Sequence, residues 1–189
     1  MRTAIGLMGE RGYDGTSTRD IAAAADVTVA ALYYHFPSKL DLLREFLHEA
    51  HDVVLVRLAR EIDKAGPDPR SRLDAAVETL IWSNLHTEWA QLAAQVAWRE
   101  VARLDEPDRV KIVAKRAQMI DLVETVVRDG VTAGVFTTTD AREASRAVFT
   151  LCVTIVGPFA EMDLTLGQII ELHQRFAAAL ACTPSQSPG

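Results

Sequence analysis

Three helix-start signals lie close together near the N-terminus, and they constrain the fold more than any other feature of this 189-residue chain. They occur in the segment TSTRDIAAAADVTVAALYYHFPSK. Ser17 followed by Asp20, and Ser38 followed by Asp41, have the three-residue spacing of a capping box. Thr28, which lies between the two pairs, is a good N-cap residue. The pattern predicts two short helices joined by a turn of about four residues and followed at once by a third helix.

Two short helices connected in this way form a helix-turn-helix, whose second helix enters the major groove of DNA. The second predicted helix suits that role because its first turn is slim enough to approach base edges, and hydrogen-bond donors follow. The residues that we predict to contact DNA are Thr28, Val29, Ala30, Ala31, Tyr33, Tyr34, His35 and Lys39. The alternative is that Tyr33 and Tyr34 only cover an amphipathic helix.

The longer segment RGYDGTSTRDIAAAADVTVAALYYHFPSKLDLL resembles the DNA-binding domain of the TetR family of bacterial repressors. The resemblance covers about residues 4–47, and ALYYHFPSK is its most specific part. It implies that the eight residues above contact DNA, and that Thr18 and Arg19 reach phosphate from the preceding helix. Val29 and Ala30 stand where many relatives have a polar residue and a glycine. We therefore expect base readout to depend on apolar contacts with thymine methyl groups.

The charge of the predicted DNA-binding segment is unusual for that role. The chain has a formal net charge of -6, and residues 1–47 hold five Arg and Lys residues against six Asp and Glu residues. Phosphate contacts supply much of the affinity for DNA, so this balance counts against tight binding. The resemblance offers a reason, because relatives begin with a basic arm and a longer first helix. We expect the first helix here to be truncated and the natural protein to begin upstream of Met1.

The rest of the chain predicts an all-α protein of about nine helices, because apolar residues recur at helical spacing and no segment alternates like a strand. We expect a three-helix DNA-binding domain over residues 1–47, a larger helical domain for ligand binding and dimerisation over 48–182, and a disordered tail over 183–189. The later helices are expected at 38–64, 70–89, 90–103, 105–134, 140–157 and 165–182.

The composition predicts a cytoplasmic protein. Hydrophobic residues make up 49% of the chain, enough for a core, yet no apolar run reaches the roughly 18 residues of a membrane span. The N-terminus does not read as a signal peptide. Cys152 and Cys182 are isolated and have no metal-ligand spacing, which indicates reduced thiols and no metal site.

The segment 147–160 is apolar nearly all round, so it must be buried on several sides. Either it is the central helix of the core, or a partner subunit or ligand covers one face. The TetR resemblance implies a homodimer through about residues 142–159 and 165–181, in which two reading heads bind a near-palindromic operator.

The candidate ligand site lies around residues 80–100, where all three tryptophans of the chain occur. If one helix covers 70–89, then Trp82, His86 and Trp89 share a face, as in an apolar pocket with a few polar groups. A tryptophan-rich core with one satisfied histidine is the alternative. The predicted ligand-binding residues are Trp82, His86, Trp89, Gln95 and Trp98, with Arg99, Met119, Phe149, Cys152 and Met162 as weaker candidates.

The segment WREVARLDEPDRVKIVAKRAQMIDLVETVVRDGVTAGVF resembles, more distantly, the ligand domains of TetR-type regulators of fatty-acid and steroid catabolism. That resemblance implies an acyl-CoA effector. The basic residues that would then meet the CoA phosphates are Arg99, Arg103, Arg109 and Arg116.

Other classes of protein fit less well. Glu45 and His48 form half of a di-iron carboxylate motif, but the sequence has no second Glu-x-x-His pair and no glycine-rich nucleotide motif. We therefore expect no enzyme and no cofactor. The sequence predicts a ligand-responsive DNA-binding transcriptional regulator, a repressor released by a small apolar or acyl-CoA-type effector. The alternative is a helical ligand-binding dimer without specific DNA binding.

Overall fold

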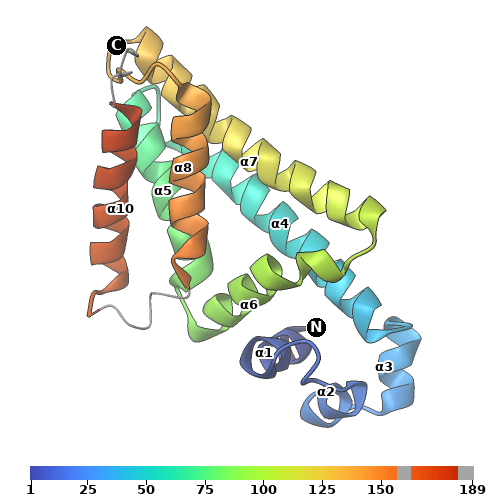
Figure 1. The fold of residues 1–189 in the computed structure, drawn as a ribbon. Helices are drawn as coiled ribbons and strands as arrows, with labels where there is room; N and C mark the ends of the chain where they lie inside the picture. The colour runs from blue at the N-terminus through green and yellow to red at the C-terminus, as the bar shows by residue number, and fades with distance from the viewer. Residues whose placement is uncertain (157–162, 183–189) are drawn as a thin grey trace, which may run out of the picture. The chain divides into compact units, whose positions relative to one another are not determined.

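The computed structural model describes residues 1–156 and 163–182 (Figure 1). This part of the chain contains nine α-helices, one 3-10 helix and no strand, which confirms the all-α prediction. Its residues form two compact units. Unit 1 comprises Met1–Val53 and Thr87–Ala114, and unit 2 comprises Val54–His86 and Lys115–Gly189. The chain therefore leaves unit 1 once and returns to it.

Unit 1 contains the predicted short helices. They are α1 (Arg2–Arg11), α2 (Thr18–Ala24) and α3 (Val29–His35). The same unit also contains α6 (Glu88–Arg99), the 3-10 helix η1 (Glu100–Arg103) and the first turns of α4 (Lys39–Lys64) and α7 (Glu106–Thr132). The predicted caps are present, because Ser17 accepts a hydrogen bond from the Asp20 amide in a full capping box, and Thr28 accepts one from the Ala31 amide. Local side-chain chemistry thus fixes where α2 and α3 begin.

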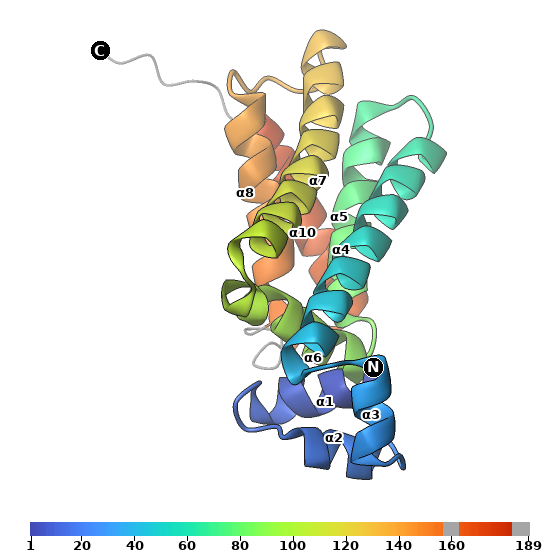
Figure 2. The same ribbon diagram turned by 90° about the vertical axis from the view of Figure 1, so that its right-hand side faces the viewer.

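Helices α1 and α6 pack closely within unit 1 (Figure 2). Their contact passes through Gly9, where an added Cβ would lie 2.7 Å from the Cβ of Leu92 and 3.1 Å from its Cα. Glycine permits this approach because it has no side chain. Around it lies the core of the unit, which includes Ile5, Met8, Ile21, Leu42, Leu43, Leu47, Val96 and Ile112.

Unit 2 is built on α5 (Pro69–Leu85), α8 (Ala141–Thr154) and α10 (Leu166–Ala181), which contact one another (Figure 1). The later turns of α4 and α7 belong to the same unit. Asp140 caps α8, and Thr165 with Gln168 forms a capping box where the last helix was expected to begin. The fully buried side chains of this unit include Leu58, Leu73, Leu80, Ile81, Val123, Val127 and Ile169.

Two expected helix boundaries are wrong. Helix α5 ends at Leu85 rather than near Trp89, and a new helix begins at Glu88 because Thr87 accepts a hydrogen bond from the Ala90 amide. The expected sixth helix ends as α-helix at Arg99 and continues as the 3-10 helix η1. The face predicted from Trp82, His86 and Trp89 therefore does not exist, since Trp89 belongs to another helix.

The compact units also divide the chain differently from the expected domain boundary near residue 47, because residues 87–114 group with the N-terminal segment. Helix α8 ends at Thr154, before the expected end at residue 157. Residues 157–160 of the predicted apolar segment lie outside the described residues, as does the tail 183–189. In the part of the chain that the structure describes, no helix is both long and apolar enough to cross a bilayer.

Candidate nucleic-acid interface

The turn between α2 and α3 is tight because one residue adopts a left-handed conformation. Asp26 has φ +53°, a value that aspartate tolerates better than most residues with a side chain. The amide of Val27 donates to the carbonyl of Ala22 at 3.0 Å, which closes the turn on the end of α2. Thr28 is extended and starts α3. The sequence thus folds locally into two helices with a short, hydrogen-bonded connection.

Helix α3 presents most of its surface outward. Tyr34 is 86% exposed and Tyr33 45% exposed. Leu32 and Phe36 instead pack against the core of unit 1. Tyr34 therefore does not serve as a packing residue of unit 1. Its ring meets that of His35 edge to face, with the ring centroids 5.3 Å apart.

The other predicted contact residues of α3 lie on or beside this exposed surface. Thr28, Ala30, Ala31 and His35 are exposed, and Val29 is half-buried. Small side chains at the start of a helix leave room for base edges to approach, so the first turn of α3 has the shape that readout needs.

Helix α2 adds polar groups beside α3. The hydroxyl oxygens of Thr18 and Tyr33 lie 3.3 Å apart and form a hydrogen bond between the two helices. Arg19 is exposed next to Thr18. Two hydroxyls and one guanidinium thus lie near the α2–α3 pair, and hydroxyl and guanidinium groups are common partners of DNA phosphate.

Lys39 has a role that sequence reasoning missed. Its ammonium donates to the carbonyls of Tyr13 at 2.7 Å and Thr16 at 2.8 Å, and lies 3.9 Å from the centre of the Tyr13 ring. The observed contacts of Lys39 are therefore with residues of unit 1 itself. Tyr13 lies 26 residues earlier in the chain, and no local pattern signals such a contact.

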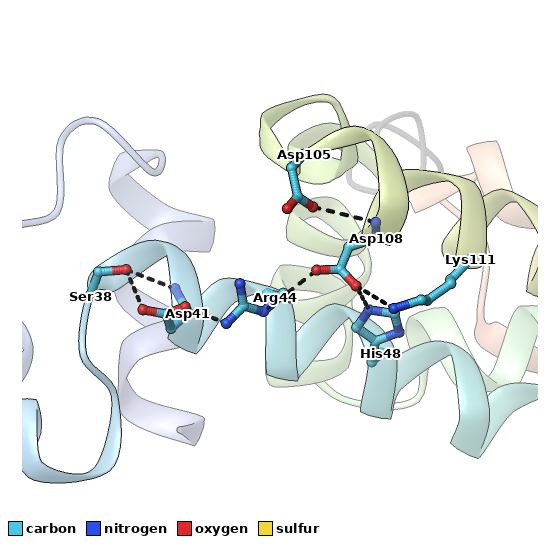
Figure 3. A network of polar contacts seen from close by, with 7 residues as sticks. All are labelled: Ser38, Asp41, Arg44, His48, Asp105, Asp108 and Lys111. Atoms are coloured by element: carbon cyan, nitrogen blue, oxygen red, sulfur yellow. Dashed lines mark hydrogen bonds and ion pairs between the residues drawn. The ribbon is translucent and has the colours of Figure 1, made fainter.

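The start of α4 is joined to the start of α7 by a polar network (Figure 3). Asp108 is its centre, accepting from Lys111 at 3.1 Å and lying 3.2 Å from the His48 ring nitrogen and 3.7 Å from Arg44. The hydrogen bond from Lys111, followed by that from His48, holds the pKa of the Asp108 carboxyl below its usual value. Two helix-capping hydrogen bonds extend the network. The hydroxyl of Ser38 donates to the Asp41 carboxylate at the start of α4, and the amide of Asp108 donates to the Asp105 carboxylate at the start of α7.

A groove of about 530 Å³ runs beside this network. Acidic and basic groups are mixed in its lining, so it has no single charge preference. The lining residues are His35, Phe36, Pro37, Asp41, Arg44, Glu45, His48, Asp108 and Lys111. Within the described residues, no group of three or more His, Cys, Asp or Glu side chains is arranged to hold a metal ion.

The predicted ligand residues are divided between the units. In unit 2, the rings of Trp82 and His86 stack in parallel with centroids 3.6 Å apart, and the guanidinium carbon of Arg57 lies 3.6 Å from the Trp82 ring. Within residues 1–156 and 163–182, the Nε atom of Arg57 is buried without a hydrogen-bond partner. Arg57 was missed because it lies on α4, 25 residues before Trp82 in the sequence. A buried N–H of this kind is a potential donor to a bound group.

Met119, Phe149 and Cys152 are buried in unit 2, and burial raises the pKa of the Cys152 thiol to about 12. The structure places the remaining candidates in unit 1. Trp89 donates its indole N–H to the Arg2 carbonyl at 3.3 Å, whereas Gln95 is half-buried and Trp98 and Arg99 are exposed. Met162 lies outside the described residues.

The arginines predicted to meet CoA phosphates are dispersed as well. Arg103 pairs with Asp14 and Glu100 in unit 1, and Arg109 is exposed there. Arg116 lies in unit 2, where burial lowers the pKa of its guanidinium. The four arginines therefore do not form one cluster within either unit.

A capped α2, a hydrogen-bonded turn and an outward-facing α3 define unit 1 as a helix-turn-helix head. Comparison with known families agrees with that class. The family described as bacterial regulatory proteins, tetR family, matches residues 1–46, and the tetracyclin repressor-like C-terminal domain matches residues 66–157. The chain belongs to the TetR family.

Curated relatives match mainly through short segments. The HTH-type transcriptional repressor KstR2 of Rhodococcus jostii is 41% identical over 76 residues, which are 40% of this chain and 37% of that protein. The biofilm operon icaADBC HTH-type negative transcriptional regulator IcaR of Staphylococcus aureus is 48% identical over 42 residues, 22% of this chain and 23% of that one. The matched segments thus span well under half the length of these curated relatives.

Solved structures match nearly the whole chain. A bacterial regulatory protein in the tetR family from Rhodococcus RHA1 has a TM-score of 0.83 at 25% identity, over 97% of this chain and 96% of that one. The structure of AibR in complex with isovaleryl coenzyme A and operator DNA has a TM-score of 0.82 at 24% identity, over 93% and 94% of the two chains. The second likeness concerns the fold alone.

Proposed function

We propose that this chain is a DNA-binding transcriptional regulator, and specifically a repressor, that reads its operator with α3. The observation that carries the proposal is the outward face of α3, where Tyr34 is 86% exposed beside the small residues of the first turn. The second helix of a helix-turn-helix is the element that enters the major groove, and a tyrosine hydroxyl on it can bond to DNA phosphate. The repressor names of the curated relatives support the same reading.

We further propose a cytoplasmic homodimer formed through about residues 142–159 and 165–181, of which 157–159 lie outside the described residues. Leu151 on α8 is 40% exposed and Phe176 on α10 is 46% exposed. Large apolar side chains exposed on neighbouring helices are typical of a surface that a second subunit covers. A two-fold dimer would place two copies of α3 one turn of DNA apart on a near-palindromic operator.

We propose that the effector is a small apolar or acyl-CoA-type molecule that binds unit 2 beside Trp82. Support comes from the stack of Arg57, Trp82 and His86, which combines aromatic surface with a donor at Arg57 Nε. AibR, a protein of the same fold, has been solved with isovaleryl coenzyme A. Titration with isovaleryl-CoA should change the tryptophan fluorescence of the wild type and not that of Trp82→Phe. An equal response in both proteins would place the site elsewhere.

The alternative function is a helical ligand-binding dimer that recognises no DNA sequence. The observation that favours it is the charge of residues 1–47, where acidic residues outnumber basic ones by six to five. Phosphate neutralisation supplies a large part of DNA affinity, and this segment has little positive charge to supply it.

One experiment separates the two functions. The full chain is used to select duplexes from a pool of random sequences, and binding to the selected duplex and to a scrambled one is measured by fluorescence anisotropy over a salt series. A regulator binds the selected duplex at least about 1,000-fold more tightly. Equal, weak binding to both duplexes would establish the alternative.

A further inference from the structure

The segment between α1 and α2 is held by two cations that come from distant parts of the sequence. We propose that Lys39 and Arg103 fix this segment around Tyr13 and thereby set where α2 begins. Arg103 is a positioning residue for DNA recognition and contacts neither DNA phosphate nor effector phosphate. Lys39 holds the same segment with two of its three N–H donors. The inference rests on the proposed function. We refer to Tyr13, Asp14, Lys39 and Arg103 as the Tyr13 cluster.

Lys39 holds the cluster from α4. An ammonium group has three N–H donors. Two of those of Lys39 point to the carbonyls of Tyr13 and Thr16, at 2.7 and 2.8 Å, and the Tyr13 ring lies 3.9 Å away. Lys39 thus engages the segment with two of its three N–H donors and with the face of the Tyr13 ring.

Arg103 holds the cluster from η1. Its Nη1 atom donates to Asp14 Oδ1 at 3.1 Å, Nη2 donates to Oδ2 of the same carboxylate, and Nε donates to Glu100. The guanidinium carbon also lies 4.7 Å from the centre of the Tyr13 ring. Three of the five N–H donors of the guanidinium are thus used by two carboxylates of the same unit. Tyr13 is thus in contact with two cations, one from α4 and one from η1.

The held segment leads directly into α2. Thr16 is fully buried, its hydroxyl donates to the Gly12 carbonyl at 2.9 Å, and its amide donates to the Tyr13 carbonyl at 3.3 Å. The next residue, Ser17, is the N-cap of α2. Because no residue separates Thr16 from the cap, any shift of this segment moves the first turn of α2. That turn includes Thr18, whose hydroxyl is bonded to Tyr33 on α3.

The expected effect is moderate, because the cluster is partly solvated. The side chain of Arg103 is 38% exposed and that of Asp14 is 76% exposed, so the ion pair alone contributes little. The cation–π contact and the orientation of Asp14 add to it. We expect loss of Arg103 to weaken specific DNA binding about 3- to 10-fold.

The test compares Arg103→Met with Arg60→Met, which removes an exposed arginine of α4 in unit 2. Affinity for the duplex selected by the wild type is measured by anisotropy at five salt concentrations. Amide hydrogen exchange of residues 16–21 is measured in the free protein. Arg103→Met should lower the affinity, leave the slope of log K against log salt unchanged and speed exchange at residues 16–21. Arg103→Lys should restore part of each effect, and Arg60→Met should change neither.

Two results would overturn the inference. A slope reduced by about 0.9 for each lost contact would show that Arg103 binds phosphate directly. Unchanged affinity together with unchanged exchange would show that Arg103 does not fix the segment. Lys39→Met is the second variant. It should also speed exchange at residues 16–21, and unchanged exchange would show that Lys39 does not hold the segment. If the wild type selects no duplex, the proposed function fails, while the exchange measurement still decides whether Lys39 and Arg103 hold the start of α2.

Discussion

The close approach of α1 and α6 makes Gly9 the most sharply testable position in the head. In Gly9→Ala, the new Cβ would lie 2.7 Å from Leu92 Cβ and 3.1 Å from Leu92 Cα. The second distance involves backbone, which cannot rotate away, so the two helices must separate by a few tenths of an ångström. Overpacking of this kind costs about 1–3 kcal/mol.

Gly6 provides a matched control on the same helix, because an added Cβ there meets nothing within 4 Å. Alanine is a better helix former than glycine by about 1 kcal/mol at either position. This gain cancels when the two variants are compared, and the clash at Gly9 remains. Gly6→Ala should therefore be more stable than Gly9→Ala by about 1–3 kcal/mol.

The assay is urea and thermal unfolding of the wild type and both variants at one protein concentration, since dimerisation would make the midpoint depend on concentration. A difference of 1 kcal/mol corresponds to about 2–4 °C in a chain of this length. Equal melting temperatures for Gly6→Ala and Gly9→Ala would refute the close packing of α1 on α6.

Three further predictions concern single side chains. Tyr34→Ala should weaken binding to the selected duplex while the melting temperature stays unchanged. The control Val56→Ala, at an exposed position in unit 2, should change neither quantity. Unchanged affinity of Tyr34→Ala would show that α3 is not the reading helix. The Asp108 pKa is lowered from 3.8, so the ionised network stabilises the fold above about pH 4, and this stabilisation is lost as the pH falls through the lower, folded-state pKa. The stability difference between wild type and Asp108→Asn should therefore shrink in acid unfolding series below pH 4, and a constant difference would contradict this account. Cys182 is exposed, whereas Cys152 is buried with a pKa of about 12. A thiol reagent at pH 8 should therefore label one thiol per native chain, that of Cys182, and two in denaturant. Two reactive thiols in the native protein would show that Cys152 is accessible.

Local chemistry explains which parts of the fold could be predicted from the sequence. The starts of α2, α3, α8 and α10 are set by an N-cap side chain that accepts a hydrogen bond from the amide three residues on, and all four starts were predicted. The break between α5 and α6 was expected near residue 89, a few residues later than its position in the structure, because the apolar pattern continues across Thr87, the cap of α6.

Contacts between distant segments account for what the sequence did not indicate in the candidate sites. Trp89 was grouped with Trp82 by helical spacing, yet its partner is the Arg2 carbonyl, 87 residues away. Arg103 was assigned to an effector because it is basic, and it pairs with Asp14, 89 residues away. Spacing rules describe neighbours on one helix and give no information about which helices meet.

The interrupted path of the chain through unit 1 limits how this protein can be recombined. Residues 1–47 look like a cassette that could be exchanged between family members, but their core is completed by α6, which the chain supplies after residue 87. A chimaera that transplants only the N-terminal segment would set Gly9 against a foreign helix and would remove the partner of Asp14. Successful exchange of DNA specificity should therefore require transfer of residues 87–114 together with the reading helix, or replacement of α3 alone.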